Sequence, residues 1–277
     1  MNNIESLLDE IQTAQTTGDT FLEAQSNAKI GKLLLERNIY QDAVHYYQRA
    51  ADLFGEENRI NHQSRSLNHL GICLVMLNQP KQAIKPLTTA QKLAEADGDH
   101  FLSASAGGNL GLAYSALDDY AKAIESHKSV LENSERLQDR SLQLTALINL
   151  ADCYLQNKNY QSAQGFALVA LDLSKSLDSL PSQILVYDLL GMITSHSQDL
   201  RSAVEYHQQA YQIAASLGDL HRQGIALANQ GLALEGLTEL QAAFQAIEQA
   251  REIFLLLNSD YLQKTNQDLE RIKTSLF

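Results

Sequence analysis

Small and apolar residues recur along this chain at intervals of 40 positions, with polar stretches between them. A glycine stands at one phase in five of the six units and an alanine in the fourth, at Gly31, Gly71, Gly111, Ala151, Gly191 and Gly231. Twelve positions after every anchor comes an alanine: Ala43, Ala83, Ala123, Ala163, Ala203 and Ala243. Coincidences in six successive units indicate an internal repeat. The small anchor residue is expected to let two helices approach closely.

Turn residues divide each unit into two helical segments. Gly18-Asp19, Gly98-Asp99 and Gly218-Asp219 recur at the same phase of the repeat. A glycine can end one helix in the left-handed conformation, and the aspartate after it can cap the next helix, so each pair predicts a sharp antiparallel corner. The opposite corner has a capping residue at Asp119, Asn159 and Asp199. Each 40-residue unit is therefore predicted to be a hairpin of two helices.

The repeat extends over nearly the whole chain and predicts one all-α domain over residues 1–277. This domain has a leading half-repeat at 1–18, repeats anchored at 31, 71, 111, 151, 191 and 231, and a trailing capping helix at 260–277. About seven antiparallel hairpins fit this length. Stacked hairpins form a solenoid, in which each unit is stabilised by burial against its neighbours.

The units resemble tetratricopeptide repeats. The resemblance is plainest at Asn109-Leu110-Gly111-Leu112-Ala113-Tyr114, followed by Asp119-Tyr120 and Ala123-Ile124. The period is 40 residues instead of the usual 34, which is similar to the long repeats of kinesin light chains, spindle-orientation adaptors and bacterial Rap-type regulators. The resemblance implies a right-handed superhelix that holds a segment of another protein in its concave groove. It does not imply catalysis.

In this family the first helix of each hairpin lines the inner face. The matching columns imply a polar binding surface made of Lys29, Lys32, Arg65, Asn68, His69, Asn109, Asn149, Asp152, Asp188 and Asn229. Asparagine is a mediocre helix former, so its return at Asn109, Asn149 and Asn229 needs a reason. An amide both donates and accepts, so this row can pair with the backbone of an extended peptide. Alternatively, the amides bond the neighbouring hairpin. Both interpretations remain open.

Charge and composition narrow the function classes. The chain has 33 acidic and 21 basic residues and a net charge of −12, so a nucleic acid partner is not expected. No apolar run is long enough for a membrane span and the acidic start is unlike a signal peptide, which predicts a cytoplasmic protein without a membrane partner. The eight histidines and the two cysteines, Cys73 and Cys153, form no metal-binding spacing, and no nucleophile, base and orienting group converge. We therefore expect no metal, no cofactor and no enzymatic activity.

The sequence favours a protein-interaction scaffold that binds a peptide segment or helix of a partner protein. The alternative is a Rap-like regulator that changes its superhelical pitch on binding a signalling peptide and so controls an enzyme partner. A self-assembling homo-oligomer is a third hypothesis. Scattering with and without ligand would separate the first two, because only the regulator requires a change of shape.

Overall fold

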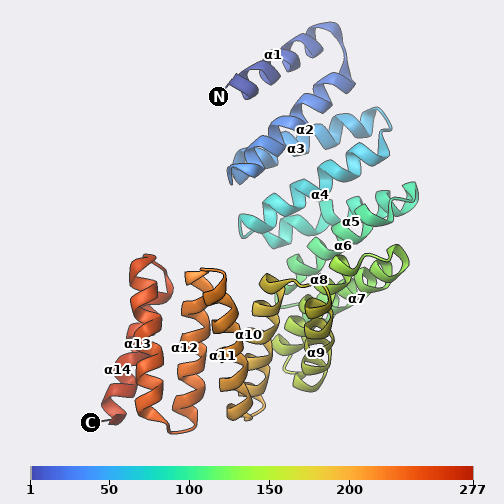
Figure 1. The fold of residues 1–277 in the computed structure, drawn as a ribbon. Coiled ribbons are helices and arrows are strands. Elements are labelled where there is room, and N and C mark those ends of the chain that lie inside the picture. The colour runs from blue at the N-terminus through green and yellow to red at the C-terminus, as the bar shows by residue number, and fades with distance from the viewer. Residues whose placement is uncertain (1, 277) are drawn as a thin grey trace. The chain divides into compact units, whose positions relative to one another are not determined.

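The computed structural model describes residues 2–276, and every regular element in that range is an α-helix (Figure 1). The prediction of an all-α fold built from antiparallel helical hairpins is confirmed. Within the described residues the helices are α1 (Asn2–Thr17), α2 (Thr20–Glu36), α3 (Tyr40–Glu56), α4 (Ile60–Met76), α5 (Pro80–Asp97), α6 (His100–Ser115), α7 (Tyr120–Leu137), α8 (Arg140–Gln156), α9 (Tyr160–Ser176), α10 (Leu180–His196), α11 (Leu200–Ser216), α12 (Leu220–Gly236), α13 (Leu240–Leu256) and α14 (Tyr261–Leu276). None of these helices is long and apolar enough to cross a membrane.

Each corner between successive helices contains one residue with a left-handed backbone. These residues follow one another every 20 positions: Gly18, Asn38, Asn58, Asn78, Gly98, Asp118, Gln138, Lys158, Asp178, Gln198, Gly218, Thr238 and Asn258. Glycine has no Cβ, and asparagine and aspartate tolerate this conformation better than other side chains. At several corners the next residue caps the following helix. The carboxylate of Asp19, for example, accepts the Leu22 N–H at 2.9 Å. The predicted corners are thus confirmed.

The anchor glycines lie beneath large side chains that come 16 residues later in the chain. A Cβ added at Gly31 would be 3.1 Å from the ring of Tyr47, and one added at Gly111 would be 2.6 Å from the ring of His127. Leu87, His207 and Ile247 cover the glycines of the second, fifth and sixth anchors in the same way. The glycine therefore makes room for a side chain of the second helix, which explains why the hairpin is closely packed.

The chain forms two compact units, residues 1–146 and 147–277, which divide within α8. In the first unit each helix from α1 to α6 packs on the next, and α4 also packs on α6, the first helix of the following hairpin. A continuous core of buried aliphatic side chains runs through it, including Ile30, Leu70, Leu87 and Leu110. The single domain expected from the repeat stays a prediction.

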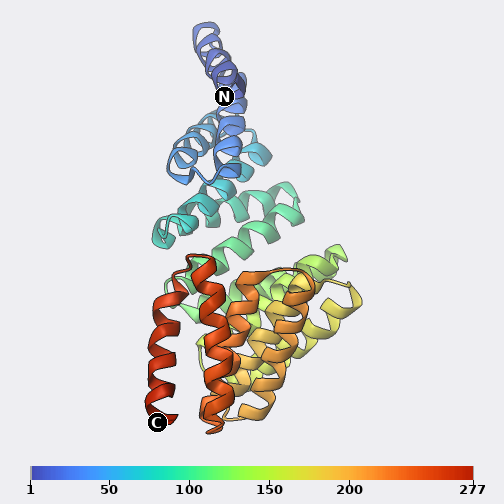
Figure 2. The ribbon, with the colours of Figure 1, turned by 60° about the vertical axis from the view of Figure 1, so that its left-hand side comes forward.

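The second unit repeats this arrangement from α9 to α14. Consecutive helices pack on each other, and the first helix α12 also contacts the first helices on either side of it, α10 and α14. The orange and red helices of Figure 2 show α12 to α14 packed side by side. Phe254 and Ile272 are fully buried, so the trailing helix α14 covers the last hairpin with an apolar side chain. Its final residue, Phe277, lies outside the described residues.

Candidate functional site

A hollow in the first unit brings several predicted binding residues together. Its volume is about 320 Å³. The walls are α2 and α4, the first helices of two successive hairpins, and side chains of α3 form part of the lining. We call it the N-terminal pocket and define it by its lining residues: Gln25, Ala28, Lys29, Lys32, Tyr47, Phe54, His62, Arg65, Ser66 and His69. It is at the small end of the ~300–1,000 Å³ range of ligand sites, so it has room for one or two side chains.

Aromatic rings make up much of the pocket surface. The ring of His69 stacks on Tyr47 with centroids 5.1 Å apart and planes at 11°. The ring of His62 lies 5.0 Å from Phe54, and both rings contact Phe21. Phe54 and Tyr47 are fixed in the core, since each is 2% exposed. The pocket therefore offers a rigid, largely apolar surface.

Three cations surround this apolar surface. Lys29 and Lys32 come from α2, and their side chains are 56% and 71% exposed. Their nearest acidic partners, Glu10 and Glu36, lie 4.0 and 3.8 Å away. Exposed ion pairs of this length contribute little, about 0–1 kcal/mol, so both ammonium groups are free to meet a ligand.

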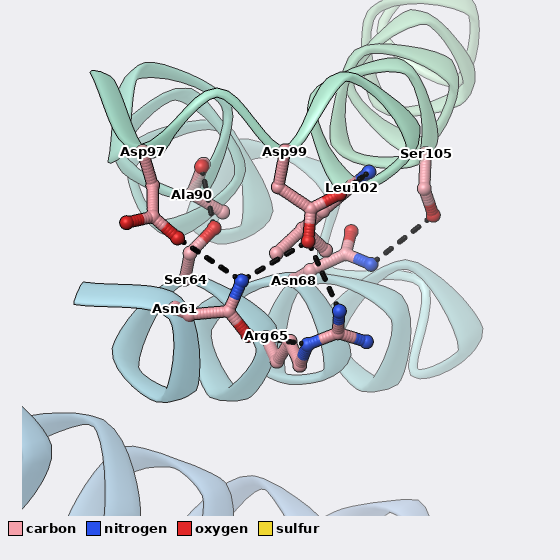
Figure 3. A network of polar contacts seen from close by, with 9 residues as sticks. All are labelled: Asn61, Ser64, Arg65, Asn68, Ala90, Asp97, Asp99, Leu102 and Ser105. Carbon is pink, nitrogen blue, oxygen red and sulfur yellow. Dashed lines mark hydrogen bonds and ion pairs between the residues drawn. The ribbon is translucent and has the colours of Figure 1, made fainter. Parts of the chain in front are cut away.

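Arg65, the third cation, is held in place by a polar network (Figure 3). Its Nε donates to Asn61 Oδ1 at 2.8 Å and one Nη donates to Asp99 Oδ2 at 3.0 Å. Asp99 caps α6 by accepting the Leu102 N–H at 2.9 Å, and Asn61 also donates to it at 3.0 Å. The Leu102 N–H, together with Asn61 and Arg65, lowers the pKa of the Asp99 carboxyl. The corner of the next hairpin thus orients a cation of the pocket.

His69 has a defined hydrogen-bonding state at neutral pH. Its Nδ1 lies 2.7 Å from the carbonyl oxygen of Arg65, so Nδ1 must be the nitrogen that bears the proton. Burial lowers the pKa of His69. The bond to the carbonyl opposes this effect, and the charges of Arg65 and Lys32 lower the pKa further. In the neutral ring Nε2 is an acceptor, and it becomes a donor when the ring is protonated.

The predicted asparagines in the first unit bond each other. Asn109 Nδ2 donates to Asn68 Oδ1 at 2.9 Å, and Asn68 Nδ2 donates to Ser105 Oγ at 3.3 Å, which links α4 to α6. Asn68 is 4% exposed, whereas Asn109 is half-buried. For Asn68 this arrangement agrees with the interpretation that the amides bond the neighbouring hairpin. Asn109 is the more exposed member of the pair.

The predicted residues of the second unit do not share the N-terminal pocket. Asn149, Asp152 and Asn229 are half-buried on α8 and α12, and Asp152 accepts a hydrogen bond from Gln156 at 3.2 Å. Asp188 is engaged with the buried His207, whose Nδ1 lies 3.0 Å from its carboxylate. The carboxylate of Asp188 is therefore already bonded within the fold, to His207 of the second helix.

The sequence predicted four residues that line this pocket, Lys29, Lys32, Arg65 and His69, but did not indicate its aromatic floor. Tyr47 and Phe54 belong to the second helix of the hairpin, which the family pattern places away from a ligand. A signal was present on α4, because His62, Arg65, Ser66 and His69 are spaced i, i+3, i+4, i+7 and so share one helix face. Among residues 2–276, no group of three His, Cys, Asp or Glu side chains is placed to hold a metal ion.

Comparison with known proteins identifies the repeat. Residues 102–176 match the tetratricopeptide repeat family model. Among solved structures, the STAND signal-transduction ATPase with a tetratricopeptide repeat sensor from Pyrococcus horikoshii is similar over 91% of this chain, with a TM-score of 0.70 and 14% identity. The chain spans 42% of that ATPase. No match is found among curated protein sequences.

Two further solved structures have the same fold. A Rap protein complexed with competence and sporulation factor covers 92% of this chain and 76% of its own, with a TM-score of 0.63 and 16% identity. Kinesin light chain repeats from Podosopora anserina cover 70% of this chain and 95% of their own, with a TM-score of 0.60 and 18% identity. Residues 102–176 therefore match tetratricopeptide repeats, and the similar helical hairpins on either side of them give the described chain the same fold as these tetratricopeptide repeat structures.

Proposed function

We propose that this protein is an interaction scaffold that binds a peptide segment or helix of a partner protein along the first helices of its hairpins. One observation supports this most strongly: four residues predicted to contact a ligand, Lys29, Lys32, Arg65 and His69, line one pocket over a rigid aromatic floor. A hollow with an apolar floor and a few polar groups at its rim has the usual composition of a binding site.

The proposal gives the asparagines a secondary role. Asn109, Asn149 and Asn229 are half-buried on first helices and keep the capacity to bond a peptide backbone. Asn68 instead holds Asn109 in position from the neighbouring helix. We place the protein in the cytoplasm and expect neither a cofactor nor catalysis.

A comparison of captured partners tests the proposal. The wild-type chain, the Lys32→Glu variant and the Ala28→Trp variant, which fills the pocket, are used as baits in native lysate. A partner that is retained by the wild type and lost by both variants supports the proposal. Lys81→Glu is the matched control, because Lys81 is an exposed lysine outside the pocket and the substitution changes the charge equally. If both pocket variants retain every partner, the proposed site is wrong.

A ligand-responsive regulator is the second candidate function. The division of the chain into two compact units favours it, as does the fold shared with a Rap protein whose structure contains competence and sporulation factor. Small-angle scattering of the chain with and without a captured partner peptide tests this candidate. A regulator of this type changes its radius of gyration on binding, and a passive scaffold does not.

A further inference from the structure

We infer that the second unit has a self-association surface, through which two copies of the chain form an antiparallel, two-fold symmetric dimer. We call this surface the leucine edge. It consists of seven exposed residues: Leu180, Leu217, Leu220, Leu255, Leu256, Leu257 and Tyr261. None of them belongs to the N-terminal pocket, so the inference goes beyond the proposed function and does not depend on it.

The leucine edge follows from the register of the repeat. Its residues lie at three successive corners, where α9 leads into α10, α11 into α12 and α13 into α14. Leu177, Leu217 and Leu257 each precede the left-handed residue of their corner, and Leu180 and Leu220 follow it by two positions. In Figure 1 the last two of these corners lie at the same, upper end of the helices. The period of 40 residues thus places apolar side chains along one border of the unit.

The three corners are held together by helix packing. His221 of α12 lies edge-on to the rings of Phe254 and Tyr261, with centroids 6.4 and 5.7 Å away, and Tyr261 stacks on Phe254 at 5.3 Å. Phe254 is fully buried, which fixes this group of rings. At the other corner, α10 packs on both α11 and α12. Because the surface is already ordered, association through it costs little conformational entropy.

The leucines are not needed to form a corner. The matching positions of the first unit are mostly polar, with Glu57 and Asp97 in place of Leu217 and His100 in place of Leu220. Those corners have the same left-handed backbone and the same hairpin geometry. The exposed leucines of the second unit therefore have a reason other than the fold, and contiguous apolar patches on a protein surface mark interaction sites.

The charges at these corners favour a second copy of the chain as the occupant. Two copies with a net charge of −12 each repel one another, so a contact between them requires a face with few acidic residues. Six acidic residues and one basic residue occur in the first three corners of this type, 15–22, 55–62 and 95–102. Three acidic and two basic residues occur in the corners of the leucine edge, 175–182, 215–222 and 255–262. The leucine edge is therefore the less repulsive border.

The charges of the leucine edge also complement themselves. Asp219 and Arg222 of the middle corner pair with each other at 3.6 Å. Lys175 belongs to the first corner and Asp260 to the last, and within the described residues neither forms an ion pair. When two edges meet antiparallel about a two-fold axis through the middle corner, the first corner of each copy lies opposite the last corner of the other. Two Lys175–Asp260 pairs then form at once, as a two-fold interface requires.

The area is sufficient for a weak but specific dimer. The exposed fractions range from 39% at Leu180 to 71% at Leu256. Seven side chains of ~150–200 Å², each exposed by about half, present roughly 600 Å² of apolar surface per copy and ~1,200 Å² for two copies. This total is at the lower end of specific interfaces, so we expect a dissociation constant in the micromolar range.

Sedimentation velocity of the full chain between 1 and 200 µM tests the inference. The weight-average mass should rise from that of the 30.7 kDa monomer towards twice that value. Raising the NaCl concentration from 50 to 500 mM should tighten association at least threefold, because salt screens the repulsion between two acidic copies and leaves apolar contacts in place.

Two double variants with the same change of charge locate the surface. Leu217→Lys/Leu256→Lys should weaken association at least tenfold, because it places cations in the apolar contact. Leu8→Lys/Met76→Lys is the matched control, since these side chains of the first unit are 43% and 55% exposed and lie outside the edge. It should associate at least as tightly as the wild type. Helical circular dichroism establishes that both variants are folded.

The antiparallel arrangement has its own tests. Lys175→Glu and Asp260→Lys should each weaken association at least threefold, and the double variant should restore it to within twofold of the wild type. The middle corner meets its own copy, so Leu220→Cys should form a disulfide-linked dimer under mild oxidation. Met76→Cys is the control and should remain monomeric, since the native Cys73 and Cys153 are buried and do not interfere.

Four results would overturn the inference: a wild type that stays monomeric at 200 µM, equal association of the two lysine double variants, no recovery in the charge-swapped double variant, or no excess cross-linking of Leu220→Cys over Met76→Cys. If Leu217→Lys/Leu256→Lys loses a lysate protein while the wild type is monomeric, the edge serves a different partner and the inference fails. None of these outcomes involves the N-terminal pocket, so the proposed function is decided separately by the pocket variants.

Discussion

The imidazole of His127 lies over the backbone of Gly111, so close that a Cβ on the glycine would be 2.6 Å from the ring. The same relationship joins Gly31 to Tyr47 and Gly191 to His207. In the fourth repeat the anchor is Ala151, and the residue 16 positions later is Ala167; both are fully buried. The glycine and the large side chain are thus replaced together in this repeat. The methyl group of Ala151 occupies the space that a large side chain at position 167 would need.

This relationship predicts a strong energetic coupling. Gly111→Ala should destabilise the protein by about 2 kcal/mol or more, since the new methyl group overlaps a fully buried ring. The double variant Gly111→Ala/His127→Ala reproduces the fourth repeat. In the Gly111→Ala background, His127→Ala should lower the free energy of unfolding much less than it does in the wild type. A double-mutant cycle by urea denaturation should give a coupling of at least ~1 kcal/mol. Additive effects would contradict the interpretation.

His127 and His207 occupy the same position but should respond oppositely to replacement. Neither ring nitrogen of His127 has a hydrogen-bond partner, whereas His207 is bonded to Asp188. Leu87 fills the equivalent place over Gly71. We expect His127→Leu to stabilise the protein by about 1 kcal/mol and His207→Leu to destabilise it by about 1–3 kcal/mol, because the latter leaves Asp188 without its partner. Thermal unfolding of the two variants measures both effects.

The same histidine predicts acid sensitivity. Burial lowers the pKa of His127 to about 4, whereas its unfolded value is 6.5. Between these values the unfolded chain binds more protons than the native protein. The stability contribution is therefore fully present above pH 6.5 and is lost as the pH falls to 4, on the order of 3 kcal/mol in total. Urea unfolding from pH 7 to pH 4.5 should show a smaller loss of stability for His127→Leu than for the wild type, and identical losses would contradict the assignment.

Thr238 is a strained corner residue. It is β-branched and has a φ of 62°, at a corner position where Gly218, one corner earlier, has a φ of 69°. Thr238→Gly should raise the stability by about 1 kcal/mol, because the Cβ clash of the left-handed conformation is removed. The reverse substitution, Gly218→Thr, should lower it by a similar amount. Midpoints of thermal unfolding for both variants test this, and a fall in the midpoint of Thr238→Gly would contradict it.

Asp99 is expected to contribute more than a helix cap. Asp99→Ala removes the bond to Leu102 and also those to Asn61 and Arg65, so it should cost about 2 kcal/mol. Asp19→Ala is the matched control, because the carboxylate of Asp19 caps α2 through Leu22 alone, and it should cost about 1 kcal/mol. Equal losses in urea denaturation would show that the network around Arg65 adds no stability.

The sequence by itself determined the local structure of this protein. The 40-residue period, the corners such as Gly98-Asp99 and the small anchors were sufficient to predict helices, hairpins and close packing, because caps, left-handed turns and apolar faces depend on neighbours along the chain. It also indicated Lys29, Lys32, Arg65 and His69, since these lie at fixed positions of the repeat on first helices.

The tertiary structure decided how those residues are used. It set Tyr47 and Phe54 beneath the cations, bonded Asn68 to Asn109, and paired Asp188 with His207. The two polar contacts join residues that are 41 and 19 positions apart and lie on different helices. Their existence depends on side-chain size, direction and burial across the helix interfaces, which a repeat pattern does not specify.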